Sequence, residues 1–270
     1  MSCFIAGLGV LAPGLNSGSH ALRVLRGDEP YVRLDARIPM VAGLAANEMR
    51  RCPTTARYAL DVGQQALAEA GWEAPRVATV FSSGSGDLEI LDKNCRALIQ
   101  EPIAVSPILF HNSVHNAVAG YWGIAMGSRA PSTSLSVYED SFAAGLLEAL
   151  MMASLGSPCL LVVYDTLPPA ALAPVRKVTA PFAVALAVCQ ERPAKACTRI
   201  DWAWGPRDSE ELVLDRPALE ALRTSNPAAR SLPLLQAMAR RQAARVVLPY
   251  LAEGQLLLDV CPLPAGAATD

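Results

Sequence analysis

Apolar and polar residues alternate along the chain in blocks of two kinds. Short apolar runs bounded by glycine, proline or polar residues predict buried strands, and longer segments with apolar residues at helical spacing predict helices. The strands are predicted at residues 3–10, 76–83, 132–138, 158–165, 181–190 and 198–204, the last two as a pair. The helices are predicted at 54–71, 88–99, 111–127 and 140–156.

Two of these helices carry further signals. Thr54 is placed to cap the helix 54–71, and Gly71 is placed to end it. The helix 111–127 is apolar on nearly every face after its first turn, which predicts that it is buried. Because strands and helices alternate and the strands are continuously apolar, the pattern predicts an α/β fold with helix-covered sheets.

Beyond Trp204 the pattern weakens. Two helical segments are predicted near 217–224 and 231–243. They are followed by a hairpin at 244–262 with its turn at Glu253–Gly254. The closing AGAATD is expected to fray, as chain ends commonly do.

Composition narrows the class of protein. The 270 residues are 52% hydrophobic, which is enough for one large domain or two small ones with a sizeable core. A formal net charge of −2 gives no electrostatic signature of nucleic-acid binding. Membrane insertion is disfavoured because no segment has about 20 uninterrupted apolar residues. We therefore expect neither nucleic acid nor a membrane as a partner.

The N-terminus and the cysteines bear on the compartment. The opening MSCFIAGLGVLAPG has no Lys or Arg ahead of its apolar run, so a buried first strand is predicted rather than a signal peptide. The seven cysteines are scattered and form no CxxC pair. This distribution favours reduced thiols in a cytoplasmic protein over a disulfide framework or a zinc cluster.

An acidic pair, Glu139–Asp140, lies where a predicted strand turns into a predicted helix. Chains with this strand–turn–helix pattern often place a catalytic nucleophile at the turn, but here the turn carries carboxylates. Asp140 suits either a helix cap that accepts backbone N–H bonds or a contact with a partner. A general acid–base pair is disfavoured because adjacent residues at a turn seldom point at one substrate atom.

Three other patterns suggest ligands only weakly. His111 and His115 have the spacing of metal ligands on one helix face, but no third ligand has a recognisable spacing, so no metal is expected. The SSGSGD turn lacks the lysine and spacing of a phosphate-binding loop, and we expect no cofactor. Arg240, Arg241 and Arg245 suit a solvated helix face, or alternatively a contact with an acidic carrier protein.

Several ordered motifs together resemble the β-ketoacyl synthases, which have the thiolase fold. FIAGLGVLAPG resembles their opening strand, and VFSSGSGDLEIL resembles the turn after their second strand. The segment SPILFHNSVHNAVAGYWGIAMGSRAPSTSLS resembles the approach to their active site and includes Asn116, Gly120, Gly127 and Pro131. PCLLVVYD and PFAVALAVCQERPAKACTRIDWAW resemble the strands that follow. The resemblance covers about the first three-quarters of the chain and implies a layered α/β/α thiolase-like fold.

The chain departs from that family in three ways. Glu139 stands at the position of the family's nucleophilic cysteine. No histidine follows His115, whereas the family's two catalytic histidines lie in its C-terminal half. The second thiolase-like half is strongly reduced. Condensation needs a thiolate to carry the acyl chain and histidines to stabilise the enolate, so the chain is expected to keep the scaffold without this chemistry.

The departures resemble those of chain length factors, which are ketosynthase-like subunits that pair with an active ketosynthase. The shortness of the chain and the stretch YEDSFAAGLLEAL are similar to the aryl polyene type. The resemblance implies a heterodimer, access to an acyl carrier protein through it, and bulky residues that close the acyl tunnel. Its candidate tunnel and interface residues are Ser85, Leu109, Phe110, His111, His115, Asn116 and Asp140.

The resemblance also divides the chain. It implies a ketosynthase-like region at 1–204 and a reduced remnant at 205–270, made of helices plus a hairpin packed on the same domain. Two alternatives to a non-catalytic chain length factor remain. One is a divergent thiolase-fold enzyme that acts on acyl or malonyl carrier-protein thioesters through Glu139 with His111 or His115. The other is a decayed homodimeric scaffold.

Overall fold

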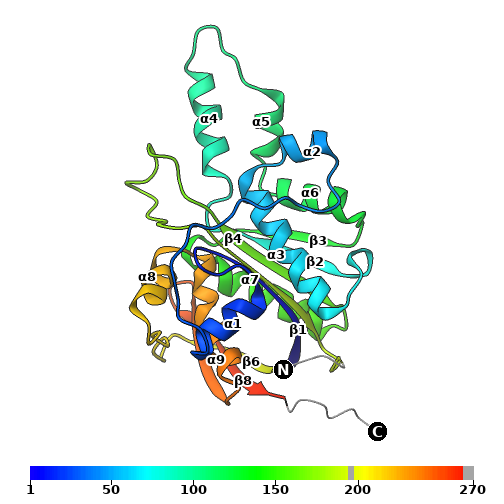
Figure 1. Cartoon of the computed structure of the whole chain (residues 1–270), viewed down its shortest axis with the longest axis vertical. Helices are drawn as coiled ribbons and strands as arrows, with labels where there is room; N and C mark the ends of the chain where they lie inside the picture. Colours follow the sequence, from blue (N-terminus) through cyan, green and yellow to red (C-terminus); the bar gives the residue numbers. More distant parts are fainter. Residues whose placement is uncertain (194–197, 264–270) are drawn as a thin grey trace.

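A sheet of eight strands forms the centre of the molecule in the computed structural model, which describes residues 1–193 and 198–263 (Figure 1). The strands lie in the order β3-β2-β4-β5-β1-β6-β8-β7. Along the chain they are β1 (Ser2–Leu11), β2 (Ala78–Ser82), β3 (Ser132–Leu135), β4 (Cys159–Asp165), β5 (Phe182–Cys189), β6 (Thr198–Pro206), β7 (Ala244–Tyr250) and β8 (Gly254–Pro262).

Helices cover both faces of this sheet (Figure 1). The α-helices are α1 (Gly18–Arg26), α2 (Ala46–Arg51), α3 (Thr54–Ala70), α4 (Leu88–Leu98), α5 (Pro107–Asn112), α6 (Ala117–Met126), α7 (Ser141–Ser154), α8 (Pro217–Ser225) and α9 (Leu232–Arg240). Three short 3₁₀ helices are η1 (Ala74–Arg76), η2 (Tyr138–Asp140) and η3 (Ala228–Ser231). Helices α4 and α5 project together from one end of the molecule.

Strand β4 shows why the central strands are apolar without interruption. Leu161 and Val163 belong to a core that includes Leu146 of α7. Leu160 and Val162 belong to a second core, on the opposite face, that includes Leu60 of α3. Successive side chains of a strand point to opposite faces, and here both faces are covered by helices. The predicted layered α/β/α arrangement is therefore confirmed.

Helix α3 approaches β1 closely because β1 contains glycines. A Cβ atom on Gly9 would lie 2.0 Å from the carbonyl oxygen of Val62, and one on Gly7 would lie 2.1 Å from that of Ala66. Any side chain at these positions would push the helix away from the sheet. The opening strand thus has glycines where a backbone passes within contact distance.

The C-terminal segment continues the same sheet. Strand β6 pairs with β1, and β8 and β7 follow it in order. Leu219 of α8, Leu235 of α9 and Leu248 of β7 belong to the same core as α7. The two predicted helical segments and the hairpin are confirmed, and the hairpin turn lies at residues 251–253. The AGAATD tail, whose fraying was expected, and Cys197 lie outside the described residues.

Three local predictions are wrong. Strands β5 and β6 do not pair, because β1 lies between them and bonds to both. Thr54 is the first residue of α3 rather than its cap, since Pro53 occupies the cap position without a side-chain bond. The predicted helix 111–127 is two helices, α5 and α6, separated at residues 113–116. Gly71 does end α3, in the left-handed conformation (φ 70°).

Helix α6 is also less buried than its composition predicts. Val118, Tyr121 and Trp122 are buried, but Ile124 is 56% exposed. An all-apolar helix with an open face leaves apolar surface in water, which is unusual unless another surface covers it. In the described part of the chain, no helix has the length and apolarity needed to cross a membrane.

Candidate functional site

The acidic pair lies in η2, a single turn between β3 and α7. Ser141 builds this turn: its Oγ accepts a hydrogen bond from Val137 N (2.9 Å) and donates one to Tyr138 O (2.9 Å). Ser82 Oγ donates to Ser141 O (2.7 Å), which ties the turn to β2. Tyr138 has φ +49°, a conformation rare for a residue with a side chain, and the residue is 56% exposed.

Two arginines meet Glu139 at this turn. Arg176 Nη1 forms a short charge-assisted hydrogen bond to Glu139 Oε1, and Arg230 Nη2 lies 3.7 Å from Oε2. Guanidinium groups stay protonated and cannot accept a proton. The arrangement at Glu139 is therefore suited to ion pairing.

Asp140 occupies the cap position of α7, but its side chain does not cap the helix. Its Oδ2 instead accepts from the backbone N of Leu251 (2.9 Å), in the β7–β8 turn, and Oδ1 lies 3.9 Å from Arg230 Nη1. Burial raises the pKa of Asp140, and the Leu251 N–H and Arg230 oppose this rise. The capping interpretation is thus wrong, because the carboxylate is used to fasten the C-terminal hairpin.

Ser85 is brought to the acidic pair by Arg176. Arg176 Nε donates to Ser85 Oγ (2.6 Å), and the guanidinium carbon lies 4.2 Å from the centre of the Tyr138 ring. The Gly-rich turn after β2 and the η2 turn are therefore held together by one side chain. No motif in the sequence indicated Arg176, because it lies in the irregular segment 166–181.

Asp165 is a buried carboxyl beside this cluster. It accepts hydrogen bonds from Ser83 Oγ and Gly84 N, both at 3.1 Å. Burial raises the pKa of Asp165 to about 7, against the lowering effect of these bonds and of Arg176. The sequence carried one signal for it, a charged residue at the end of a wholly apolar run.

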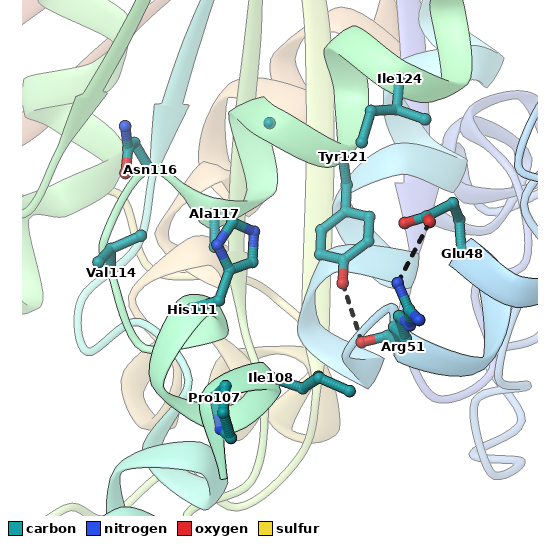
Figure 2. A pocket seen from close by; sticks show the side chains of 11 residues that line it. Glu48, Arg51, Pro107, Ile108, His111, Val114, Asn116, Ala117, Tyr121 and Ile124 are labelled. Carbon is teal, nitrogen blue, oxygen red and sulfur yellow. Dashed lines mark hydrogen bonds and ion pairs between the residues drawn. The ribbon is translucent and has the colours of Figure 1, made fainter.

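His111 and Asn116 line a cavity of about 450 Å³ between α2, α5 and α6 (Figure 2). Tyr121 closes one side, where its hydroxyl donates to Arg51 O (2.9 Å). The remaining lining residues are mostly apolar and are Pro107, Ile108, Val114, Ala117, Gly120 and Ile124, together with Glu48.

His115 lies elsewhere, because α5 ends at Asn112. It shares a smaller cavity of about 120 Å³ with Ser85. The two histidines are therefore not on one face of a helix, as their spacing had suggested. Among the described residues, no group of three or more His, Cys, Asp or Glu side chains is arranged to hold a metal.

Leu109 and Phe110 lie on α5. Leu109 is partly buried, and its carbonyl accepts from Asn94 Nδ2 of α4 (3.3 Å). Phe110 is 64% exposed. Arg240 and Arg245 are engaged by Asp215 and Asp259, and Arg241 ends α9, so the basic stretch is largely paired within the chain.

Comparisons with known proteins agree with this fold. Residues 26–247 match the family model described as the β-ketoacyl synthase N-terminal domain. A 3-oxoacyl-[acyl-carrier-protein] synthase 2 from Vibrio cholerae is 30% identical over 99 residues, which are 34% of this chain and 24% of that protein. The chain thus matches about a quarter of the length of this relative. It belongs to the β-ketoacyl synthase family.

Solved structures match over almost the whole chain. A ketosynthase (ApeO) in complex with its chain length factor (ApeC) from Xenorhabdus doucetiae gives a TM-score of 0.72 at 22% identity, covering 96% of this chain and 99% of the matched one. The ishigamide ketosynthase/chain length factor gives 0.71 at 14%, covering 98% and 100%. A β-ketoacyl synthase from Burkholderia phymatum gives 0.58 at 16%, covering 84% and 70%. These likenesses establish the fold.

Proposed function

We propose that this chain is a non-catalytic chain length factor subunit, which pairs with an active β-ketoacyl synthase and shapes its acyl tunnel. The observation that carries the proposal is an uncovered apolar surface on α5 and α6. Phe110 and Ile124 are more than half exposed, and Ile108 and Val114 are nearly half exposed. Ile108, Val114 and Ile124 line one cavity and so form a continuous surface, and Phe110 lies on the same helix as Ile108. Contiguous exposed apolar patches mark interaction sites.

The surface continues at the end of the sheet. Helix α6 packs against β2 and β3, and β3 is the first strand in the sheet order, with β2 as its neighbour. Thr79 N donates to Pro131 O and Ser83 N donates to Leu135 O, so odd-numbered residues of this strand face β2. The backbone groups of Ser132 and Ser134 accordingly face outward, where a strand of another chain has donors and acceptors to pair with.

The chemistry at Glu139 supports the proposal that this subunit does not catalyse the condensation itself. A carboxylate cannot hold an acyl thioester, and this one is paired with Arg176 and Arg230. The partner would then supply the cysteine and histidines. The comparisons also support the proposal, because the two matches to ketosynthase–chain length factor complexes cover almost all of this chain and almost all of the matched chain.

The more detailed parts of the proposal rest on the resemblance of the sequence to chain length factors. Leu109 and Phe110 are proposed to reach the partner's acyl pocket and limit product length, and an acyl carrier protein is reached through the complex. The product is proposed to be of the aryl polyene type. The region 1–204 is proposed to carry the ketosynthase-like interface, with 205–270 as its reduced remnant.

Co-expression tests the proposal directly. The chain is produced with the ketosynthase encoded beside it, a tag on one protein only, and the eluate is measured by size exclusion and native mass. We expect a one-to-one complex, and we expect the chain expressed alone to aggregate through its exposed apolar surface. A stable monodisperse monomer, or activity of the isolated chain on malonyl or acyl carrier protein that Glu139→Gln abolishes, would contradict the proposal.

A further inference from the structure

Arg176 is more enclosed than the other charged side chains of the ion pairs around Glu139 and Asp140. Only 7% of it is exposed, although it lies in a segment without regular secondary structure. A buried cation is costly unless it is paired and hydrogen-bonded. Here Glu139 supplies the charge, Ser85 supplies a second acceptor, and the Tyr138 ring lies against the guanidinium.

The packing around this guanidinium leaves little freedom. A Cβ atom on Gly84 would lie 2.6 Å from Arg176 Nη2 and 2.7 Å from Tyr138 O. The turn after β2 and the η2 turn therefore meet through the guanidinium with no room for a side chain between them. Glycine at position 84 is required by this close approach.

Tyr138 is held in an unusual state by these contacts. Its left-handed backbone is strained for a tyrosine, and such strain persists only where the surroundings over-determine it. Arg176 lies against the ring, while Ser141 bonds to the carbonyl. Tyr138 nevertheless remains more than half exposed, three residues beyond the end of β3. A fixed aromatic side chain is thus presented beside the open edge of the sheet.

We propose that Arg176 is the positioning residue of the partner-binding surface, because its guanidinium locks Ser85, Tyr138 and Glu139 into one rigid unit that the ketosynthase contacts through Tyr138. This inference rests on the proposed function. It assigns to the acidic turn a structural role in place of the lost nucleophile. Rigid aromatic side chains bind with little loss of conformational entropy, so fixing Tyr138 before contact strengthens association.

The geometry requires a guanidinium rather than any cation. Nε and Nη1 bond to two different groups while the planar face lies on a ring. A lysine ammonium is a compact point charge and cannot make this set of contacts. We therefore expect Arg176→Lys to behave nearly as Arg176→Ala does.

The experiment compares three variants in the complex with the ketosynthase. Arg176→Ala and Arg176→Lys remove the guanidinium. Arg223→Ala is the matched control, since Arg223 is 10% exposed and paired with Glu211 and Glu220 but touches none of the three locked residues. Dissociation constants are measured with and without methylguanidinium at millimolar concentration, and amide hydrogen exchange is followed in the segments 83–87 and 137–141.

We expect both Arg176 variants to weaken association about tenfold, the usual scale for an interface anchor, and to exchange faster in both segments. Methylguanidinium should restore Arg176→Ala, while urea at the same concentration should not. Arg223→Ala should associate as the unaltered chain does. Equal weakening by Arg223→Ala and Arg176→Ala, or unchanged association of the Arg176 variants, would overturn the inference.

The outcome separates this inference from the proposed function. If the unaltered chain binds no ketosynthase, the proposed function fails and the partner-contact role of Tyr138 fails with it. In that case the exchange and rescue measurements on the isolated chain still decide whether Arg176 locks the two turns. If the complex forms but Arg176 variants bind normally, only the positioning role is lost.

Discussion

The two edge strands of the sheet, β7 and β3, differ in the residues that would prevent pairing with another chain. At one end, β7 carries Pro249, which has no N–H to donate, and Arg245, whose guanidinium bonds to both carboxylate oxygens of Asp259 on β8 (2.8 and 3.0 Å). At the other end, β3 is made of Ser, Thr, Ser and Leu. It has neither a proline nor a charge.

This difference indicates which end of the sheet is suited to pairing with another chain. Proteins block exposed edge strands with charges and prolines, because an unblocked edge pairs with other chains. The β7 end has both of these devices. The β3 end lacks them and lies beside the exposed apolar face of α6. A surface left open at one end of the sheet only is the pattern of a specific interface.

The largest expected effect comes from blocking the open edge. Ser134→Pro removes an N–H that faces away from β2, so the fold should remain while association with the ketosynthase falls by about a hundredfold, or about 2.7 kcal/mol. Titration of the complex measures this change. Ser134→Ala is the control and should bind normally, and Thr133→Pro, which alters the inner side of β3, should unfold the chain instead. Normal binding by Ser134→Pro would place the interface elsewhere.

The second prediction contrasts carboxyls near the two ends. Asp165 has a folded-state pKa of about 7 against an ordinary value of 3.8, so the folded state holds its proton more tightly. Its contribution to stability is present at low pH and is lost as pH rises toward 7. In the unaltered chain, we expect the free energy of unfolding to fall by about 2 kcal/mol between pH 5 and 8, measured by urea unfolding of the dilute chain. Asp165→Asn should abolish this fall.

Asp259 should show the opposite sign. The hydrogen bond from Arg245 lowers the pKa of Asp259, so its small contribution is present at neutral pH and is lost as pH falls through that pKa. Asp259→Asn should therefore reduce the dependence of the free energy of unfolding on pH only below about pH 4. If the free energy of unfolding changes with pH in the same way in both variants, the environment of Asp165 is not the cause of the pH dependence.

The third prediction concerns Phe110. Its ring is exposed in the chain alone, so Phe110→Ala should leave thermal stability unchanged while weakening the complex about tenfold. Val213, equally exposed at 64% but in the segment before α8, is the matched control. If Val213→Ala weakens the complex as much, the α5 surface has no special role. Longer products from the Phe110→Ala complex would support its tunnel role.

The smallest effect is expected from opening the blocked end. The double variant Arg245→Thr/Pro249→Thr removes both protecting features from β7. In the complex with the ketosynthase, it should give weak, concentration-dependent self-association, measured by sedimentation. The single variant Arg245→Lys keeps a charge on the edge and should remain as the unaltered chain. Absence of self-association in the double variant would mean that neighbouring elements, rather than these residues, protect β7.

Much of the fold could be predicted because it rests on local patterns. The apolar run of β4 and the buried helix α7 follow from composition and period alone, since both are enclosed in the core. The break between α5 and α6 was missed although it falls in the polar stretch HNSVHN (111–116), because a polar turn at the start of one continuous helix has the same composition. The order β5-β1-β6 was also missed, since strand pairing depends on contacts between distant segments.

The candidate site, too, has features that local sequence predicts and features that it does not. The sequence located the acidic pair at a strand-to-helix turn and the loss of the nucleophile, and both depend only on residue identity and local order. The tertiary structure decided what the pair does. Arg176, Arg230 and the Leu251 amide reach it from positions 37 to 111 residues further along the chain. Ion pairs and buried carboxyls take their properties from such long-range neighbours and from burial, which a linear pattern of residues does not contain.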